Sequence, residues 1–256
     1  MTERRWVWMY GVAGDDLDAR ASGAAGVGGA SLRTITAAGL TGIVGDVTDR
    51  EYGEAALRRN LEDLDWLART ARAHHAVLET VAGGGPVVPM RLATLFADDA
   101  AVASMLRERA DDFRRALSLI EARSEWGVKA YVTKPADPVV DSEPQATGPG
   151  AAYLRRRRAA LNASKDARSQ ALASAQAVYA ELGRVAELSR LYPPQAPDLA
   201  GQPAPMVLNA AYLVSDERAR EFSAAVARLA KSHRVVELAL TGPWPPYSFV
   251  GEDSPG

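Results

Sequence analysis

The sequence predicts an α+β protein made of two small domains. Its 256 residues exceed the usual size of a single core, because domains average about 150 residues. In both halves, aromatic and β-branched runs alternate with runs of helical spacing. Hydrophobic residues make up 47% and charged residues 24%, as in ordinary globular proteins. We therefore expect two mixed domains, residues 1–122 and 123–256.

The first half begins with a small sheet. Residues 6–12 are aromatic and β-branched, and residues 32–35 and 42–47 form two short β-type runs separated by glycine. A hairpin beside the first strand is the arrangement that these runs predict.

Helical spacing starts at Glu54. Apolar residues recur every three or four positions and are expected to face the core: Leu57, Leu61, Leu64, Leu67 and Ala71. An extended segment at 86–92 precedes a second amphipathic helix, which Asp98 caps.

The second half is predicted to follow the order β-α-β-α-β. Strands are expected at 125–132, 206–214 and 234–240. The longest helix is expected at 150–192, stopped by two prolines, and a shorter helix follows Ser215. The long helix has an apolar stripe formed by Leu161, Leu172, Val178, Leu182, Val185, Leu188 and Leu191. Two proline-rich segments, a loop or lid at 134–150 and a linker at 195–205, flank this helix.

The charge balance and the absence of cysteine exclude several functions. Thirty basic and 32 acidic residues give a net charge of -2, so no global field attracts nucleic acid or an anionic membrane. The chain has no cysteine, which excludes disulfides, thiolate metal sites and a thiol nucleophile. No apolar run predicts a signal peptide or a membrane span, so we expect a cytoplasmic protein.

The sequence contains no complete catalytic motif, which favours a protein that is not an enzyme and has no cofactor or metal. His74 and His75 are adjacent and point about 100° apart on a helix, and His233 closes the last helix, so a structural role is favoured. The glycine-rich segments 26–29 and 83–85 complete no phosphate-binding motif and are interpreted as turns.

Two segments could bind a partner. Four consecutive arginines occupy residues 155–158, but on a helix they sweep about 300° and form no flat patch. One or two of them could pair with acids of the neighbouring loop or of a partner protein. The C-terminal segment 241–250 combines three prolines with Trp244, Tyr247 and Phe249. It is suited equally to packing on its own domain and to binding a partner.

The ending TGPWPPYSFV, at 241–250, resembles the gas vesicle protein F/L family (GvpF/GvpL). Further matches occur in the same order along the whole chain. They are WMYGV at 8–12, HAVLE at 75–79, PVVPMR at 86–91, EWGVK at 125–129, GAAYLRR at 150–156 and NAAYLV at 209–214. One departure is Leu92-Ala93-Thr94, where the family usually has Phe-Gly-Thr.

The resemblance implies an accessory protein of gas vesicle assembly with two α+β domains, the second a modified ferredoxin-like unit. It also implies that the protein caps or delivers the hydrophobic major shell protein, acts with other accessory proteins, and is located in the cytoplasm at or within the gas vesicle. An apolar subunit of this kind would aggregate unless covered. The candidate partner-binding residues are Arg91, Tyr153, Arg155, Trp244, Tyr247 and Phe249.

Two alternatives stay open at the level of the sequence. One is an enzyme with a small-molecule site in a groove between the domains, using His74 or His75 near Arg91. The other is a nucleic-acid-binding module centred on residues 155–158.

Overall fold

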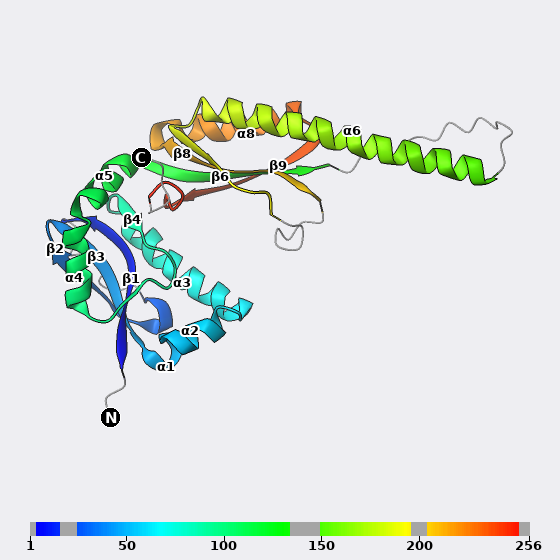
Figure 1. Cartoon of the computed structure of the whole chain (residues 1–256). Coiled ribbons are helices and arrows are strands. Elements are labelled where there is room, and N and C mark those ends of the chain that lie inside the picture. Colours follow the sequence, from blue (N-terminus) through cyan, green and yellow to red (C-terminus); the bar gives the residue numbers. More distant parts are fainter. Residues whose placement is uncertain (1–3, 16–24, 134–148, 196–203, 251–256) are drawn as a thin grey trace. The chain divides into compact units, whose positions relative to one another are not determined.

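The computed structural model describes residues 4–15, 25–133, 149–195 and 204–250 (Figure 1). The chain divides into two compact units. The first contains the residues up to Ser124 and the tail that begins at Trp244, and the second contains Glu125–Pro243. The chain therefore passes between the units twice.

The first unit is built on an antiparallel sheet with the strand order β2-β3-β1-β4, and β5 also pairs with β1. The strands are β1 (Arg5–Gly14), β2 (Leu32–Ala37), β3 (Leu40–Thr48), β4 (Val87–Pro89) and β5 (Leu95–Phe96). The predicted hairpin is formed by β2 and β3, in which Ala37 pairs with Leu40. Its two turn residues, Ala38 and Gly39, have φ values of 54° and 70°, a left-handed conformation that suits a tight hairpin turn.

Helices cover both faces of this sheet. They are α1 (Asp49–Tyr52), α2 (Glu54–Asn60), α3 (Leu64–Ala82), α4 (Asp99–Glu108) and α5 (Ala110–Ile120). Side chains alternate between the faces of β1. Accordingly, Trp8 packs in one cluster with Trp66 and Leu78 of α3, while Met9 packs in another with Leu106 of α4. The sheet is buried on both sides because each face has its own helices.

The structure corrects the helix expected to start at Glu54. It breaks into α2 and α3, because Asp63 Oδ1 accepts hydrogen bonds from the backbone nitrogens of Asp65 and Trp66 and thereby caps a new helix. Two leucines expected in the core lie at this break. Leu61 is 43% exposed and Leu64 is 78% exposed.

The second unit has four strands in the order β7-β8-β6-β9. In chain order its elements are β6 (Arg123–Val132), α6 (Pro149–Gly183), β7 (Leu188–Leu191), β8 (Met206–Ser215), α8 (Ala219–Ser232) and β9 (Val236–Trp244). The core cluster joins Ala171 and Val178 of α6 and Phe222 of α8 to Val128 and Tyr212 of the sheet. Both long helices therefore contribute to one core with the sheet.

The long helix is shorter than the sequence predicts. It ends at Gly183, and residues 188–191 form the edge strand β7 instead of a last helical turn. Leu188 pairs with Leu213 of β8, and both Leu188 and Leu191 are exposed. The order is therefore β-α-β-β-α-β, the ferredoxin-like arrangement. The predicted α+β class is confirmed, and the segments expected as a lid and a linker lie largely outside the described residues.

The tail differs from the expected division at residue 122. Trp244–Val250 group with the first unit, although the sequence assigned them to the second domain. Val250 is 6% exposed and lies in a core cluster with Val88, Phe113 and Ile120. The burial of this apolar side chain holds the tail on the first unit.

Candidate functional site

One side of α3 carries apolar side chains that the first unit leaves uncovered. Leu64 is the most exposed of them, and the exposed Leu61 precedes it in the segment between α2 and α3. Ala68, Ala71 and His75 follow Leu64 at helical spacing, so all four side chains share one face of α3. Unlike Leu64, the other three side chains are half-buried. Trp244 lies against the end of this face. We define the α3 surface as Leu61, Leu64, Ala68, Ala71, His75 and Trp244.

The tail supplies the aromatic end of the α3 surface. The ring centroids of Trp244 and His75 are 5.0 Å apart. Trp244 nevertheless remains 40% exposed. His75 Nε2 lies 3.3 Å from Glu79 Oε1, without the alignment of a hydrogen bond. From Leu64 to His75 the surface runs about three helical turns, roughly 16 Å.

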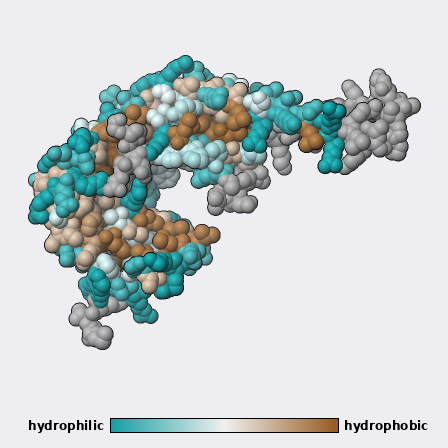
Figure 2. All heavy atoms as spheres, viewed as in Figure 1, coloured by the Kyte–Doolittle hydropathy of each residue, from teal (hydrophilic) through white to brown (hydrophobic). Residues whose placement is uncertain are grey.

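The side chains in the middle of the α3 surface are small and project less from the helix than those at its ends. Ala68 and Ala71 lie between the bulkier Leu64 and the pair of aromatic rings at the other end. Small side chains allow a second helix to approach closely, since interaxial distances depend on the residues at the contact. Figure 2 shows hydrophobic residues gathered over this part of the first unit. The exposed side chains of Arg72 and Glu79 lie along one rim.

The neighbouring His74 points into the core and is fully hydrogen-bonded. Trp8 Nε1 donates to His74 Nδ1 at 3.0 Å. His74 Nε2, which therefore carries the proton, donates to the carbonyl oxygen of Met90 at 3.1 Å. Burial lowers the pKa of His74 to about 4. Both ring nitrogens are engaged within the protein, so His74 holds α3 to the sheet and offers no free nitrogen to a substrate.

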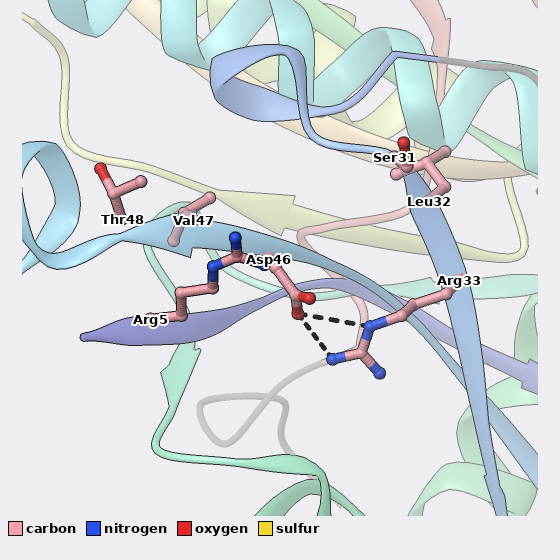
Figure 3. Close-up of a pocket in the computed structure, with 7 residues that line it drawn as sticks. All are labelled: Arg5, Ser31, Leu32, Arg33, Asp46, Val47 and Thr48. Atoms are coloured by element: carbon pink, nitrogen blue, oxygen red, sulfur yellow. Dashed lines mark hydrogen bonds and ion pairs between the residues drawn. The ribbon is translucent and has the colours of Figure 1, made fainter. Parts of the chain in front are cut away.

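A separate depression of about 330 Å³ lies beside the edge strand β2 (Figure 3). Its lining residues are Arg5, Ser31, Leu32, Arg33, Asp46, Val47 and Thr48. Arg33 Nη2 lies 2.6 Å from Asp46 Oδ1 and 2.7 Å from Asp99 Oδ1 of α4. The guanidinium is thus neutralised by two carboxylates, and it ties β2 to β3 and α4.

In the described parts of the chain, no group of three or more His, Asp or Glu side chains is placed to hold a metal ion. No helix in the same ranges is long and apolar enough to cross a membrane.

The structure separates the three aromatic residues proposed for the tail. Trp244 and Tyr247 are 40% and 38% exposed, whereas Phe249 is only 7% exposed. A backbone turn between Pro245 and Tyr247 brings the tail round on itself. Trp244 and Tyr247 therefore keep exposed surface, and Phe249 packs against the unit.

The other three proposed residues lie elsewhere. Arg91 is exposed just after β4, in the first unit. Tyr153 and Arg155 belong to α6 in the second unit, and their side chains lie outside the described residues. The six residues therefore do not form one cluster within either unit.

Sequence reasoning missed most of the α3 surface. Leu61 and Leu64 fit the core spacing, so periodicity alone assigned them to the interior. The available signal was the segment Leu61-Glu62-Asp63, because an aspartate followed by a helical run is a typical N-cap. A new helix starting at Leu64 rotates that leucine out of the earlier stripe.

These features define the class as a two-unit α+β protein whose second unit has ferredoxin-like order. The chain belongs to the gas vesicle synthesis protein GvpL/GvpF family, whose model matches residues 6–251. The role of the protein is accordingly in gas vesicle assembly.

Sequence relatives agree with this membership. The chain is 39% identical over 254 residues to gas vesicle protein L of Streptomyces sp. (strain CB03234), covering 98% of this chain and 95% of that protein. It is 27% identical over 251 residues to gas vesicle protein F2 of Halobacterium salinarum, covering 95% and 91%.

Two crystal structures share the fold. GvpF from Anabaena sp. PCC7120 gives a TM-score of 0.67 at 19% identity, with 96% of both chains covered. GvpF from Microcystis aeruginosa gives 0.65 at 15% identity, with 96% of this chain and 99% of that chain covered.

Proposed function

We propose that this protein binds the hydrophobic major shell protein of the gas vesicle and caps or delivers it during shell formation. The observation that carries the proposal is the α3 surface, which leaves Leu64 78% exposed on an otherwise well-packed unit. An exposed apolar surface rimmed by charged residues is typical of a protein-binding site. The protein acts in the cytoplasm, at or within the growing vesicle, together with other accessory proteins.

The energetics suit a reversible carrier. Fully burying one exposed large apolar side chain contributes about 1.5–3 kcal/mol, and Leu64 and Trp244, 78% and 40% exposed, each contribute part of such a gain when a partner covers them. Part of this gain offsets the entropy lost on association. The resulting affinity shields the shell protein from aggregation and still permits its release into the wall.

The remaining proposed residues have supporting roles. Tyr247 extends the apolar contact from the tail, and Arg91 orients the partner through its charge. Phe249 acts indirectly, because its burial fixes the tail that presents Trp244. Tyr153 and Arg155 provide a second contact region on the other unit.

Co-expression with a major shell protein tests the proposal. The shell protein should stay in the soluble fraction and be retained with the tagged protein. Leu64→Asp places a charge at the most exposed apolar position of the α3 surface and should reduce retention about tenfold or more. The matched control is Ala55→Asp on α2, an exposed position at which the substitution makes the same change of one charge.

The Ala55→Asp variant should behave as the wild type. Equal retention of the shell protein by the wild type and Leu64→Asp would contradict the use of the α3 surface. If the wild type itself neither retains nor solubilises the shell protein, the proposed function is wrong.

A further inference from the structure

The described side chains in the first half of α6 do not pack into the core of the second unit. Core packing begins at Ala171 and continues at Ala175, Val178 and Leu182, one face of the helix. The preceding 149–170 span about 33 Å of helix. Ala167 is half-buried there, and every other side chain described in that stretch is exposed. Figure 1 shows α6 continuing beyond the strands of its own unit.

This part of α6 concentrates positive charge. Residues 149–172 contain six basic residues and one acid, Asp166, so their net charge is +5, whereas that of the whole chain is -2. The rest of the protein is therefore acidic. Arg157, Arg158, Lys165 and Arg168 pair with no carboxylate within the described ranges. A helix that needed only solubility would not require charges of one sign.

The basic residues alternate with leucines along one stripe. Residues 158, 161, 165, 168 and 172 recur at intervals of three and four, so their side chains line one side of α6. We call these five residues the α6 stripe: Arg158, Leu161, Lys165, Arg168 and Leu172. All five are exposed, and Leu161 and Leu172 are 57% and 44% exposed. At about 100° per residue, Asp166 lies well away from this stripe.

The alternation of basic residues and leucines favours one kind of partner over others. A nucleic acid backbone binds cationic side chains, and leucines placed between them add little to its binding free energy. A membrane surface requires a broad apolar face, and the stripe offers only two exposed leucines. A protein helix with leucine or alanine along its seam and glutamate or aspartate beside it matches both features, as in charged coiled-coil pairs.

We propose that the α6 stripe docks an acidic amphipathic helix of a partner protein. The leucines would pack into the seam of the partner helix while Arg158, Lys165 and Arg168 pair with its carboxylates. The stripe extends over about 21 Å, four turns of helix. This contact lies in the second unit and goes beyond the proposed binding of the shell protein through the α3 surface.

A synthetic peptide provides the test. The probe is a fluorescent 21-residue helix with leucine along one seam and glutamate on both sides of it, and its binding to the full chain is measured by anisotropy. Replacing its glutamates with glutamine should weaken binding about tenfold or more. The triple variant R158Q/K165Q/R168Q should weaken binding of the glutamate peptide to the same degree, and Leu161→Gln should also weaken it.

A control variant separates the stripe from general charge. A163E/Q170E/A173E changes the net charge by the same amount on another side of α6, where all three residues are exposed. It should bind the peptide within about twofold of the wild type, and circular dichroism should show that both triple variants keep their helix content. Absence of peptide binding, an equal loss in the control variant, or tighter binding of a 20-nucleotide RNA would each overturn the proposal.

Discussion

His74 joins α3 to β1 and to the segment after β4 through both ring nitrogens. Its folded pKa of about 4 lies below the ordinary value of 6.5. As pH falls through this interval, the unfolded chain binds the proton first, so the free energy of unfolding falls. We expect a loss of about 3 kcal/mol between pH 6.5 and pH 4, and no effect of this group above pH 6.5.

Denaturant unfolding of the wild type and His74→Gln across this pH range measures the effect. The variant should be less stable at neutral pH, because the hydrogen bonds to Trp8 and Met90 lose the alignment that the imidazole ring gives them. It should also lack this component of the pH dependence. His233→Gln, in the second unit, should keep the wild-type dependence. Parallel pH profiles for the wild type and His74→Gln would show that His74 is not the responsible group.

Trp244 is expected to contribute to binding more than to folding, because it is 40% exposed and touches the first unit through His75. Trp244→Ala should lower the affinity for the shell protein by about 1–3 kcal/mol and the free energy of unfolding by less. Trp244→Phe should retain most of the affinity. Isothermal titration and denaturant unfolding separate the two quantities, and a larger loss of stability than of affinity would assign Trp244 to packing.

The break between α2 and α3 depends on one side chain. Asp63 caps α3 with two hydrogen bonds at 2.9 and 3.1 Å. Asp63→Ala should lower the free energy of unfolding by about 1 kcal/mol, whereas Asp65→Ala, whose side chain makes neither of these bonds, should cost less. Thermal unfolding compares the two variants, and an equal loss in both would indicate that the first-turn charge outweighs the cap.

The elements show where sequence patterns succeed and where they fail. β1 and the β2–β3 hairpin follow directly from runs of β-type residues and an intervening glycine. The edge strand β7 was missed because Leu188 and Leu191 also fit the helical spacing of α6. Helical spacing shows which residues share one face of a helix, but it does not show whether another element covers that face. The exposed leucines at 61, 64 and 161 therefore became evident only from the packing.

The chain crosses between the units a second time after Pro243, and the tail beyond this crossing is a structural part of the first unit. Ending the chain at Pro243 removes the buried Phe249 and Val250, at a cost of roughly 3–5 kcal/mol from two apolar side chains. Amide hydrogen exchange should then accelerate in β4 and α5, whose residues Val88 and Ile120 share a cluster with Val250. A chain ending at Val250 should exchange like the full chain, and unchanged exchange on removal of residues 244–250 would contradict this account.

Family membership was accessible from the ordered sequence motifs, which lie in β1, α3, β4, β6, α6, β8 and the tail, and fold class was accessible from the alternation of β-type and helical runs. The binding surface was not accessible in the same way. It depends on the cap at Asp63, the small residues Ala68 and Ala71, and the return of Trp244 to His75. That last contact joins residues far apart in the chain, which no local pattern reports.

The most direct test of shell-protein binding is site-specific photocrosslinking in cells that are forming gas vesicles. A photoreactive amino acid replaces Leu64, the most exposed apolar residue of the α3 surface, or Arg107, an exposed residue of α4, as the control. We predict crosslinks from position 64 to the major shell protein and none from position 107. If position 64 yields no crosslink to the shell protein, or position 107 yields as many, the α3 surface is not where this protein meets its partner.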